Sequence, residues 1–255
     1  MVRNSTCLAG EAVACLRQQH RRTYDVPGAY LQGKQLACEQ VLARPPLGFR
    51  TVDERGVEIL WLMLIPLYGQ QDAGAIWNRT YNQYVTDLSG PLAFERSSND
   101  PCLYTKRVDG GGQISNLLYV DDGRLYYDTD AKTAAQGHAC AKVLVDKFEV
   151  KLKDEDMDED YFLGSNYHQH SRAATTVTAY TYINKMVKTY INGDCTVSRD
   201  RPAAWSYTPA DETLDRAYAE AVAQRAPASS ELTKRYQTLF GALMHAVKYR
   251  PEIAA

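Results

Sequence analysis

The chain has 255 residues, of which 45% are hydrophobic and 24% are charged, and its formal net charge is −2. These values are typical of a folded globular protein with a sizeable core, and they exclude a basic surface that covers the whole chain. The longest apolar run, residues 59–68, is too short to span a bilayer and contains Pro66.

The remaining composition indicates an intracellular protein. Its six cysteines lack the paired spacing of a zinc site, so we expect free thiols. The N-terminus has no compact apolar core of a signal peptide. His168 and His170 have no further His or Cys nearby in the sequence, and we expect them to be surface residues. The acidic run DEDMDED (154–160) is expected to be a solvated loop.

In the first half of the chain, apolar spacing predicts a helix over 9–19, followed by a strand, RRTYDV, that ends at Asp25 before a Pro-Gly break. RPPLGF (44–49) is predicted to be a loop, and GVEILWLML (56–64) is predicted to be a strand. A helix is predicted over 72–88, with Trp77 in its core face.

In the second half, the turn SSNDPCLY (97–104) precedes a hairpin over 114–128 and an amphipathic helix over 131–148. Short strands are predicted over 160–170 and 175–183, with helices near 184–190, 214–224 and 232–247. This order predicts an α+β fold, with a mostly helical second part that starts between 160 and 211.

Two adjacent aspartates, Asp121 and Asp122, stand in the middle of the predicted hairpin, in ISNLLYVDDGRLYYD. Asp25 ends a strand, so its carboxylate could meet the hairpin pair at a strand end. Carboxylates brought together without cationic partners repel one another unless a divalent cation compensates for their charge. Mg²⁺ suits such a site, because it prefers oxygen ligands and is commonly completed by substrate phosphates.

These motifs resemble those of reverse transcriptases. YVDD (119–122) is similar to their polymerase motif, and YDVPGAYLQG (24–33) is similar to their first catalytic motif. The further landmarks resemble the copia-type branch of LTR retrotransposons, and they run in order from residue 9 to the end: RPPLGF, PLYG…AGAIWN, SSNDPCLY, YFLG, YTPAD and YQTLFGALMHAVKYRPEIA.

The resemblance implies a fold and a reaction. The fold is a right-hand polymerase palm, an antiparallel sheet with flanking helices, plus a partial and mostly helical thumb or connection. We expect residues 1–160 to be the palm with a truncated fingers remnant and residues 161–255 to be the thumb-like region, with RNase H, integrase and protease absent. The expected partners are an RNA/DNA primer–template and dNTPs, with no membrane. The expected location is the cytoplasm, in a virus-like particle, or the nucleus.

The resemblance also implies residue roles. Asp25, Asp121 and Asp122 would be the catalytic metal ligands for two Mg²⁺ ions, with Mn²⁺ as the alternative. Tyr30 would be the steric gate against a ribose 2′-hydroxyl, rather than only a core aromatic, and Tyr119 would lie beside the primer terminus. The segment Val26, Gly28 and Ala29 would approach the triphosphate. Gln70 and Gln71 would contact the nucleotide, although QQDAG (70–74) departs here from the LKQAP of many relatives.

Two other interpretations remain open. The chain could be an inactive transposon remnant that at most binds nucleic acid. It could also be an unrelated metal-dependent phosphohydrolase that uses the same aspartates, but this leaves the ordered landmarks from Arg44 to Ala254 unexplained.

Overall fold

A computed structural model describes residues 4–35, 41–190, 233–234, 237–238 and 240–241. The chain forms two compact units: one contains residues 1–163 and 167–176, and the other contains residues 164–166 and 177–255. The predicted helix over 214–224 and most of that over 232–247 lie outside the described residues. In the described residues no helix is long and apolar enough to cross a membrane.

The elements that form the body of the fold are α1 (Asn4–Arg17), β1 (His20–Asp25), η1 (Ala29–Gln32), α2 (Ala73–Val85), β4 (Glu95–Arg96), β5 (Leu103–Val108), β6 (Gly112–Tyr119), β7 (Asp122–Tyr127), α3 (Ala131–Phe148) and β8 (Lys151–Leu152). An arm between η1 and α2 contains β2 (Val41–Ala43), η3 (Leu47–Phe49) and β3 (Trp61–Met63). After β8 follow β9 (Glu159–Phe162), β10 (Ser165–Ser171), β11 (Ala174–Thr178) and α4 (Tyr180–Tyr190).

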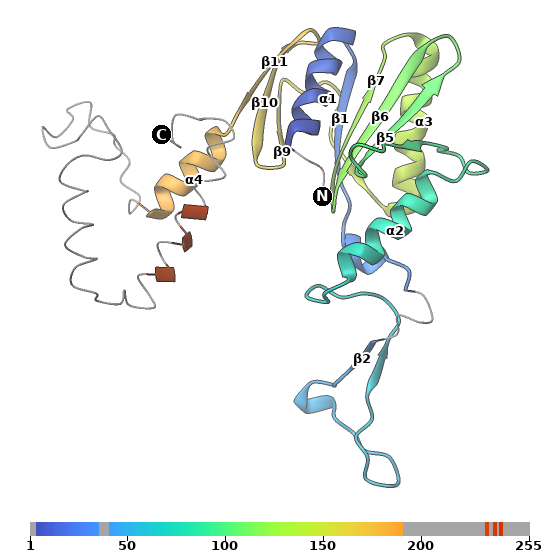
Figure 1. The fold of residues 1–255 in the computed structure, drawn as a ribbon, viewed down its shortest axis with the longest axis vertical. Coiled ribbons are helices and arrows are strands. Elements are labelled where there is room, and N and C mark those ends of the chain that lie inside the picture. Colours follow the sequence, from blue (N-terminus) through green and yellow to red (C-terminus); the bar gives the residue numbers. More distant parts are fainter. Residues whose placement is uncertain (1–3, 36–40, 191–232, 235–236, 239, 242–255) are drawn as a thin grey trace, which may run out of the picture. The chain divides into compact units, whose positions relative to one another are not determined.

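A six-stranded antiparallel sheet carries the body, in the order β4-β5-β6-β7-β1-β8. Its middle strands run side by side in Figure 1. β6 and β7 form the predicted hairpin, and β1 pairs with β7 over its full length, from His20 opposite Tyr127 to Asp25 opposite Asp122. A strand almost a hundred positions upstream thus lies directly beside the paired aspartates. The two smaller sheets have the orders β11-β10-β9 and β2-β3.

Helices cover both faces of this sheet. Successive side chains of a strand point to opposite sides, so each face offers its own set of side chains for a helix to pack against. On one face, Gly10 of α1 lies against Leu117 and Tyr126. On the other face, Tyr127 packs against Gly137 of α3, and the main core cluster also includes Trp77 and Tyr81 of α2. The mixed α+β class with antiparallel pairing is confirmed.

A buried polar network lies inside the core beneath the end of β1. The Tyr24 hydroxyl donates to Asn116 Oδ1 at 2.8 Å and lies 3.0 Å from the Tyr81 hydroxyl, while Asn116 Nδ2 donates to Tyr81 at 2.6 Å. All three side chains are fully buried, so each polar group depends on the others for a partner. The network fixes β1, α2 and β6 relative to one another.

Several predicted boundaries were wrong. α1 begins at Asn4 rather than residue 9, and β5 begins inside the predicted turn over 97–104. The predicted strand over 175–183 ends at Thr178, and its last residues begin α4. Of the predicted strand over 56–64, only Trp61–Met63 is extended as a named strand. That strand pairs with β2, and its Trp61 is 47% exposed. A β-prone sequence forms a long strand only where neighbouring strands and a buried face stabilise it, and this segment has few such neighbours.

The prediction of a solvated loop for the acidic run is only partly right, since residues 154 and 157–159 are exposed but the other three are not. Asp160 has only 8% of its side chain exposed, and Glu155 and Asp156 are half-buried in polar contacts. The predictions of surface histidines and free cysteine thiols are confirmed for the residues that the structure describes. His168 and His170 are exposed, and among the described cysteines Cys7, Cys15, Cys102 and Cys140 are free thiols.

Gly123 allows a very close backbone approach in the sheet. It lies opposite Tyr24, and a Cβ at this position would stand 1.9 Å from Cζ of the Tyr24 ring. The ring cannot move aside, because its hydroxyl is held in the buried network. We therefore predict that Gly123→Ala lowers the free energy of unfolding by about 3 kcal/mol, measured by urea denaturation.

Gly48→Ala is the matched control, since a Cβ there meets no atom within 4 Å. It should change stability by less than about 0.5 kcal/mol. Equal effects of the two substitutions would show that Tyr24 does not fix this part of the sheet.

Candidate functional site

The end of β1 and the β6–β7 turn bring the three predicted aspartates to one end of the sheet. Asp25 is the residue directly opposite Asp122, and directly opposite residues of an antiparallel pair point to the same face. Asp121 lies in the turn between Tyr119 and Asp122. Asp25 is exposed, and the other two aspartates are partly buried.

Two hydrogen bonds from outside the hairpin hold this turn. The backbone N–H of Val26 donates to the Asp121 carbonyl at 2.7 Å, and the indole N–H of Trp77 donates to the Val120 carbonyl at 2.6 Å. Val120 has a φ of 53°, a left-handed conformation that is costly for a β-branched residue. The surrounding contacts must therefore hold the turn. The prediction that Trp77 is a core residue is confirmed, since it is 1% exposed.

The charge at the site is unbalanced. Burial, followed by the charges of Asp121 and Asp25, raises the pKa of Asp122 to about 6, and the positive charge of Lys153 offsets only part of this. A cation bound at this position would relieve the repulsion. The donor set, three carboxylates and nearby backbone, is the all-oxygen kind that Mg²⁺ and Mn²⁺ accept. The residues therefore fit a divalent cation.

The three aspartates are not the tightest ligand group. In the part of the chain that the structure describes, the group of three potential ligands whose atoms all lie within 4.8 Å of one another is His20, Glu155 and Asp156. The oxygens of the three aspartates do not all lie within 4.8 Å of one another.

Tyr30 lies beside the aspartate-bearing turn. It lines a cavity of about 350 Å³ together with Gly74, Ala75, Trp77, Asn78, Arg96, Pro101, Cys102, Leu118 and Val120. Its ring lies 5.0 Å from that of Tyr68, centroid to centroid. The turn contributes Val120 to the wall of this cavity, whereas none of the three aspartates lines it.

The predicted triphosphate segment forms a tight turn after β1. Val26 and Ala29 are 1% exposed and belong to the core cluster, so only their backbone could face a ligand. Gly28 has a φ of 59°, a left-handed conformation that glycine adopts without strain, and its carbonyl accepts from the Leu31 N–H at 2.8 Å.

The two glutamines precede α2. Gln70 donates through Nε2 to Asp72 Oδ1 at 2.7 Å and accepts from the Leu67 N–H at 3.3 Å, so its amide stabilises the local turn. Gln71 is exposed. Tyr119, the other predicted contact, is the residue opposite Asp122 in the hairpin and is partly buried.

Lys153 and Asp160 lie near the site, although no motif in the sequence indicates it. Their charges act on Asp122 in opposite directions, and they form an ion pair of 2.7 Å with each other. They follow β8, which pairs with the end of β1, and Thr23 of β1 accepts from the Lys153 N–H and donates to Asp160 Oδ2. A sequence pattern without the sheet order could not have found them.

Comparison with known proteins identifies the family. A family model described as reverse transcriptase (RNA-dependent DNA polymerase) matches residues 6–199. The chain belongs to the reverse transcriptase family. A transposon Ty5-1 protein of Saccharomyces cerevisiae is 26% identical over 162 residues, which cover 63% of this chain and 47% of the yeast protein. The chain thus spans about half the length of the curated relative that it matches, and the predicted resemblance to reverse transcriptases is confirmed.

The raised pKa of Asp122 predicts a pH-dependent stability in this reverse transcriptase domain. A carboxyl whose folded pKa exceeds its unfolded value of about 3.9 stabilises the fold below that value, and this contribution is lost as the pH rises through about 6. Asp122→Asn should therefore be more stable than the wild type at about pH 7, by about 1 kcal/mol after allowance for solvent screening.

Urea denaturation in chelator at about pH 4 and about pH 7 checks this, since the difference should disappear at the lower pH. Asp146→Asn, which removes an exposed carboxylate of α3, is the control and should show no such change. The same gain from Asp122→Asn at both pH values would contradict the charge repulsion.

Proposed function

We propose that this chain is the RNA-directed DNA polymerase domain of a copia-type LTR retrotransposon, which adds dNTPs to a primer 3′-hydroxyl on a primer–template. The observation that carries the proposal is the register of β1 and β7, in which Asp25 stands opposite Asp122 with Asp121 in the adjacent turn. The reverse transcriptase match and the similarity to a transposon protein support it.

In this proposal Asp25 and Asp121 are the main ligands of the catalytic metals, and Asp122 is the second member of the hairpin pair. Two Mg²⁺ ions, or Mn²⁺ in their place, would lower the pKa of the primer hydroxyl and neutralise the departing pyrophosphate. The protein contributes placement and charge. Trp77 and the Val26 N–H fix the turn that carries Asp121, so its carboxylate needs little reorganisation when substrate arrives.

We propose that residues near the three aspartates contact the substrates. Tyr30 would pack beneath the incoming sugar and clash with a 2′-hydroxyl, and Tyr119 would lie beside the primer terminus. The backbone of Val26, Gly28 and Ala29 would approach the triphosphate. Gln71 has an exposed side chain for a nucleotide contact, whereas Gln70 would first have to leave Asp72.

We further propose that residues 1–160 form a polymerase palm and that residues 161–255 form a thumb or connection region. The antiparallel sheet with α2 and α3 on one face supports the palm assignment. The partner of this palm would be an RNA/DNA primer–template.

Primer extension tests the reaction. With Mg²⁺, dNTPs and a DNA primer on an RNA template, the wild-type chain should extend the primer, and Asp121→Asn should lower the rate at least about 1,000-fold because a metal ligand loses its charge. Asp146→Asn, on the outer side of α3, should retain the wild-type rate.

Extension that survives Asp121→Asn would show that the site is wrongly assigned. A wild-type chain that binds primer–template without extending it would instead favour the inactive remnant.

Tyr30 sets a second, independent prediction. Tyr30→Ala should reduce the preference for dNTPs over rNTPs about 10-fold or more, because the clash with a 2′-hydroxyl is removed. Tyr30→Phe keeps the ring and should keep the preference. The ratio of kcat/KM values for the two nucleotides measures it, and unchanged discrimination in Tyr30→Ala would remove this residue from the gate role.

A further inference from the structure

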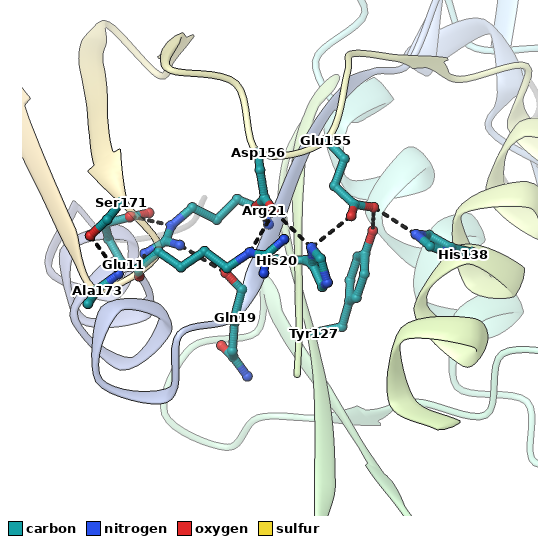
Figure 2. A network of polar contacts seen from close by, with 11 residues as sticks. Glu11, Gln19, His20, Arg21, Tyr127, His138, Glu155, Asp156, Ser171 and Ala173 are labelled. Carbon is teal, nitrogen blue, oxygen red and sulfur yellow. Dashed lines mark hydrogen bonds and ion pairs between the residues drawn. The ribbon is translucent and has the colours of Figure 1, made fainter. Parts of the chain in front are cut away.

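Two histidines and two acids meet at the other end of β1, away from the three aspartates. Figure 2 shows His20 pointing at Glu155 and Asp156, with Tyr127 and His138 on the far side of Glu155. His20 Nδ1 lies 2.7 Å from Glu155 Oε1 and 2.8 Å from Asp156 Oδ2. The side chains of His20, Asp156 and Glu155 are 13%, 16% and 24% exposed, so this is not an ordinary solvated surface pair.

The backbone and neighbouring side chains orient both carboxylates. Asp156 forms two hydrogen bonds with the backbone of Arg21 in β1, both of 2.9 Å. Its N–H donates to the Arg21 carbonyl, and its side-chain Oδ1 accepts from the Arg21 N–H. Its φ of 51° is a left-handed conformation that turns the side chain toward His20. Its Oδ2 also lies 2.9 Å from Arg172 Nε.

Glu155 is held from the opposite side. Its Oε2 accepts from the Tyr127 hydroxyl and lies 2.7 Å from His138 Nε2 of α3. The Tyr127 ring stands between the two imidazoles, with centroid distances of 5.3 Å to His20 and 5.5 Å to His138. Such contacts to the outer oxygen are those that orient a metal-ligating carboxylate.

We propose that His20, Glu155 and Asp156 bind a divalent transition-metal ion of the zinc class. One imidazole nitrogen and two carboxylate oxygens form a ligand set that suits zinc, whereas Mg²⁺ prefers oxygen ligands alone. Ligand atoms around a tetrahedral zinc lie roughly 3.3 Å apart, so the distances from His20 Nδ1 to the two carboxylate oxygens need to increase by only about half an ångström. Water takes the fourth position, and His138 orients Glu155 from outside the ligand shell.

This site is separate from the aspartate site. His20 and Asp25 stand at opposite ends of β1, five residues and roughly 17 Å apart, and point to opposite faces of the sheet. The ion ties the segment between β8 and β9 to β1 and leaves the aspartates untouched. The proposal does not rest on the polymerase function.

Calorimetric titration of chelator-treated protein with ZnCl₂ tests the site, in excess Mg²⁺ so that oxygen-only sites are occupied. The wild type should bind about one Zn²⁺ ion per chain, His138→Ala should weaken binding about 10-fold, and His20→Ala should weaken it at least about 100-fold. The control is the double variant His168→Ala/His170→Ala, which removes an exposed histidine pair and should bind as the wild type does.

Co²⁺ absorption of the wild type gives a second measurement that does not depend on the folding of any variant. Bound Co²⁺ should give a visible d–d absorption band that Zn²⁺ abolishes. The proposal is overturned if the wild type shows neither Zn²⁺ binding nor this band, if folded His20→Ala binds as tightly as the wild type, or if the His168/His170 variant is the one that loses binding.

Discussion

The antiparallel register of β1 against β7 is the constraint on which the site depends. It places Asp25 opposite Asp122, and it also brings the Val26 N–H to the Asp121 carbonyl. A slip of one residue would send every side chain of β1 to the other face of the sheet. Asp25 would then leave the hairpin aspartates, and Tyr24 would leave the buried network. One register therefore determines both the core and the chemistry at its edge.

The core enforces that register through close contacts that tolerate little change. Tyr24 fits only against a glycine at position 123, and among the residues that the structure describes its hydroxyl contacts Tyr81 and Asn116. Trp77 extends this buried layer to the site, because its indole N–H holds the turn carbonyl of Val120. The glycine after the two aspartates thus serves packing, while the aspartates carry the negative charge. Stability of the fold and geometry of the site come from adjacent residues of a single strand.

The sequence predicted what local pattern and motif can reveal. The apolar, tyrosine-rich run on either side of the two aspartates predicted the β6–β7 hairpin, and spacings of three and four predicted α2 and α3 to within a few residues. It could not predict contacts that the sheet order creates, such as Lys153 and Asp160 near Asp122. The composition of the acidic run predicts a solvated loop, because it gives no sign of the histidines that face Glu155. Residues 56–64 are apolar enough for a strand, but only three of them pair as a named strand, and Glu58 adds an isolated bridge to Val52.

Diffraction from crystals grown with Mn²⁺ tests the central claim most directly, because its anomalous signal locates the ion without reference to activity. The account predicts a peak in contact with the carboxylates of Asp25 and Asp121, with Asp122 at its edge. A Mn²⁺ peak elsewhere, with none among these three aspartates, would contradict it.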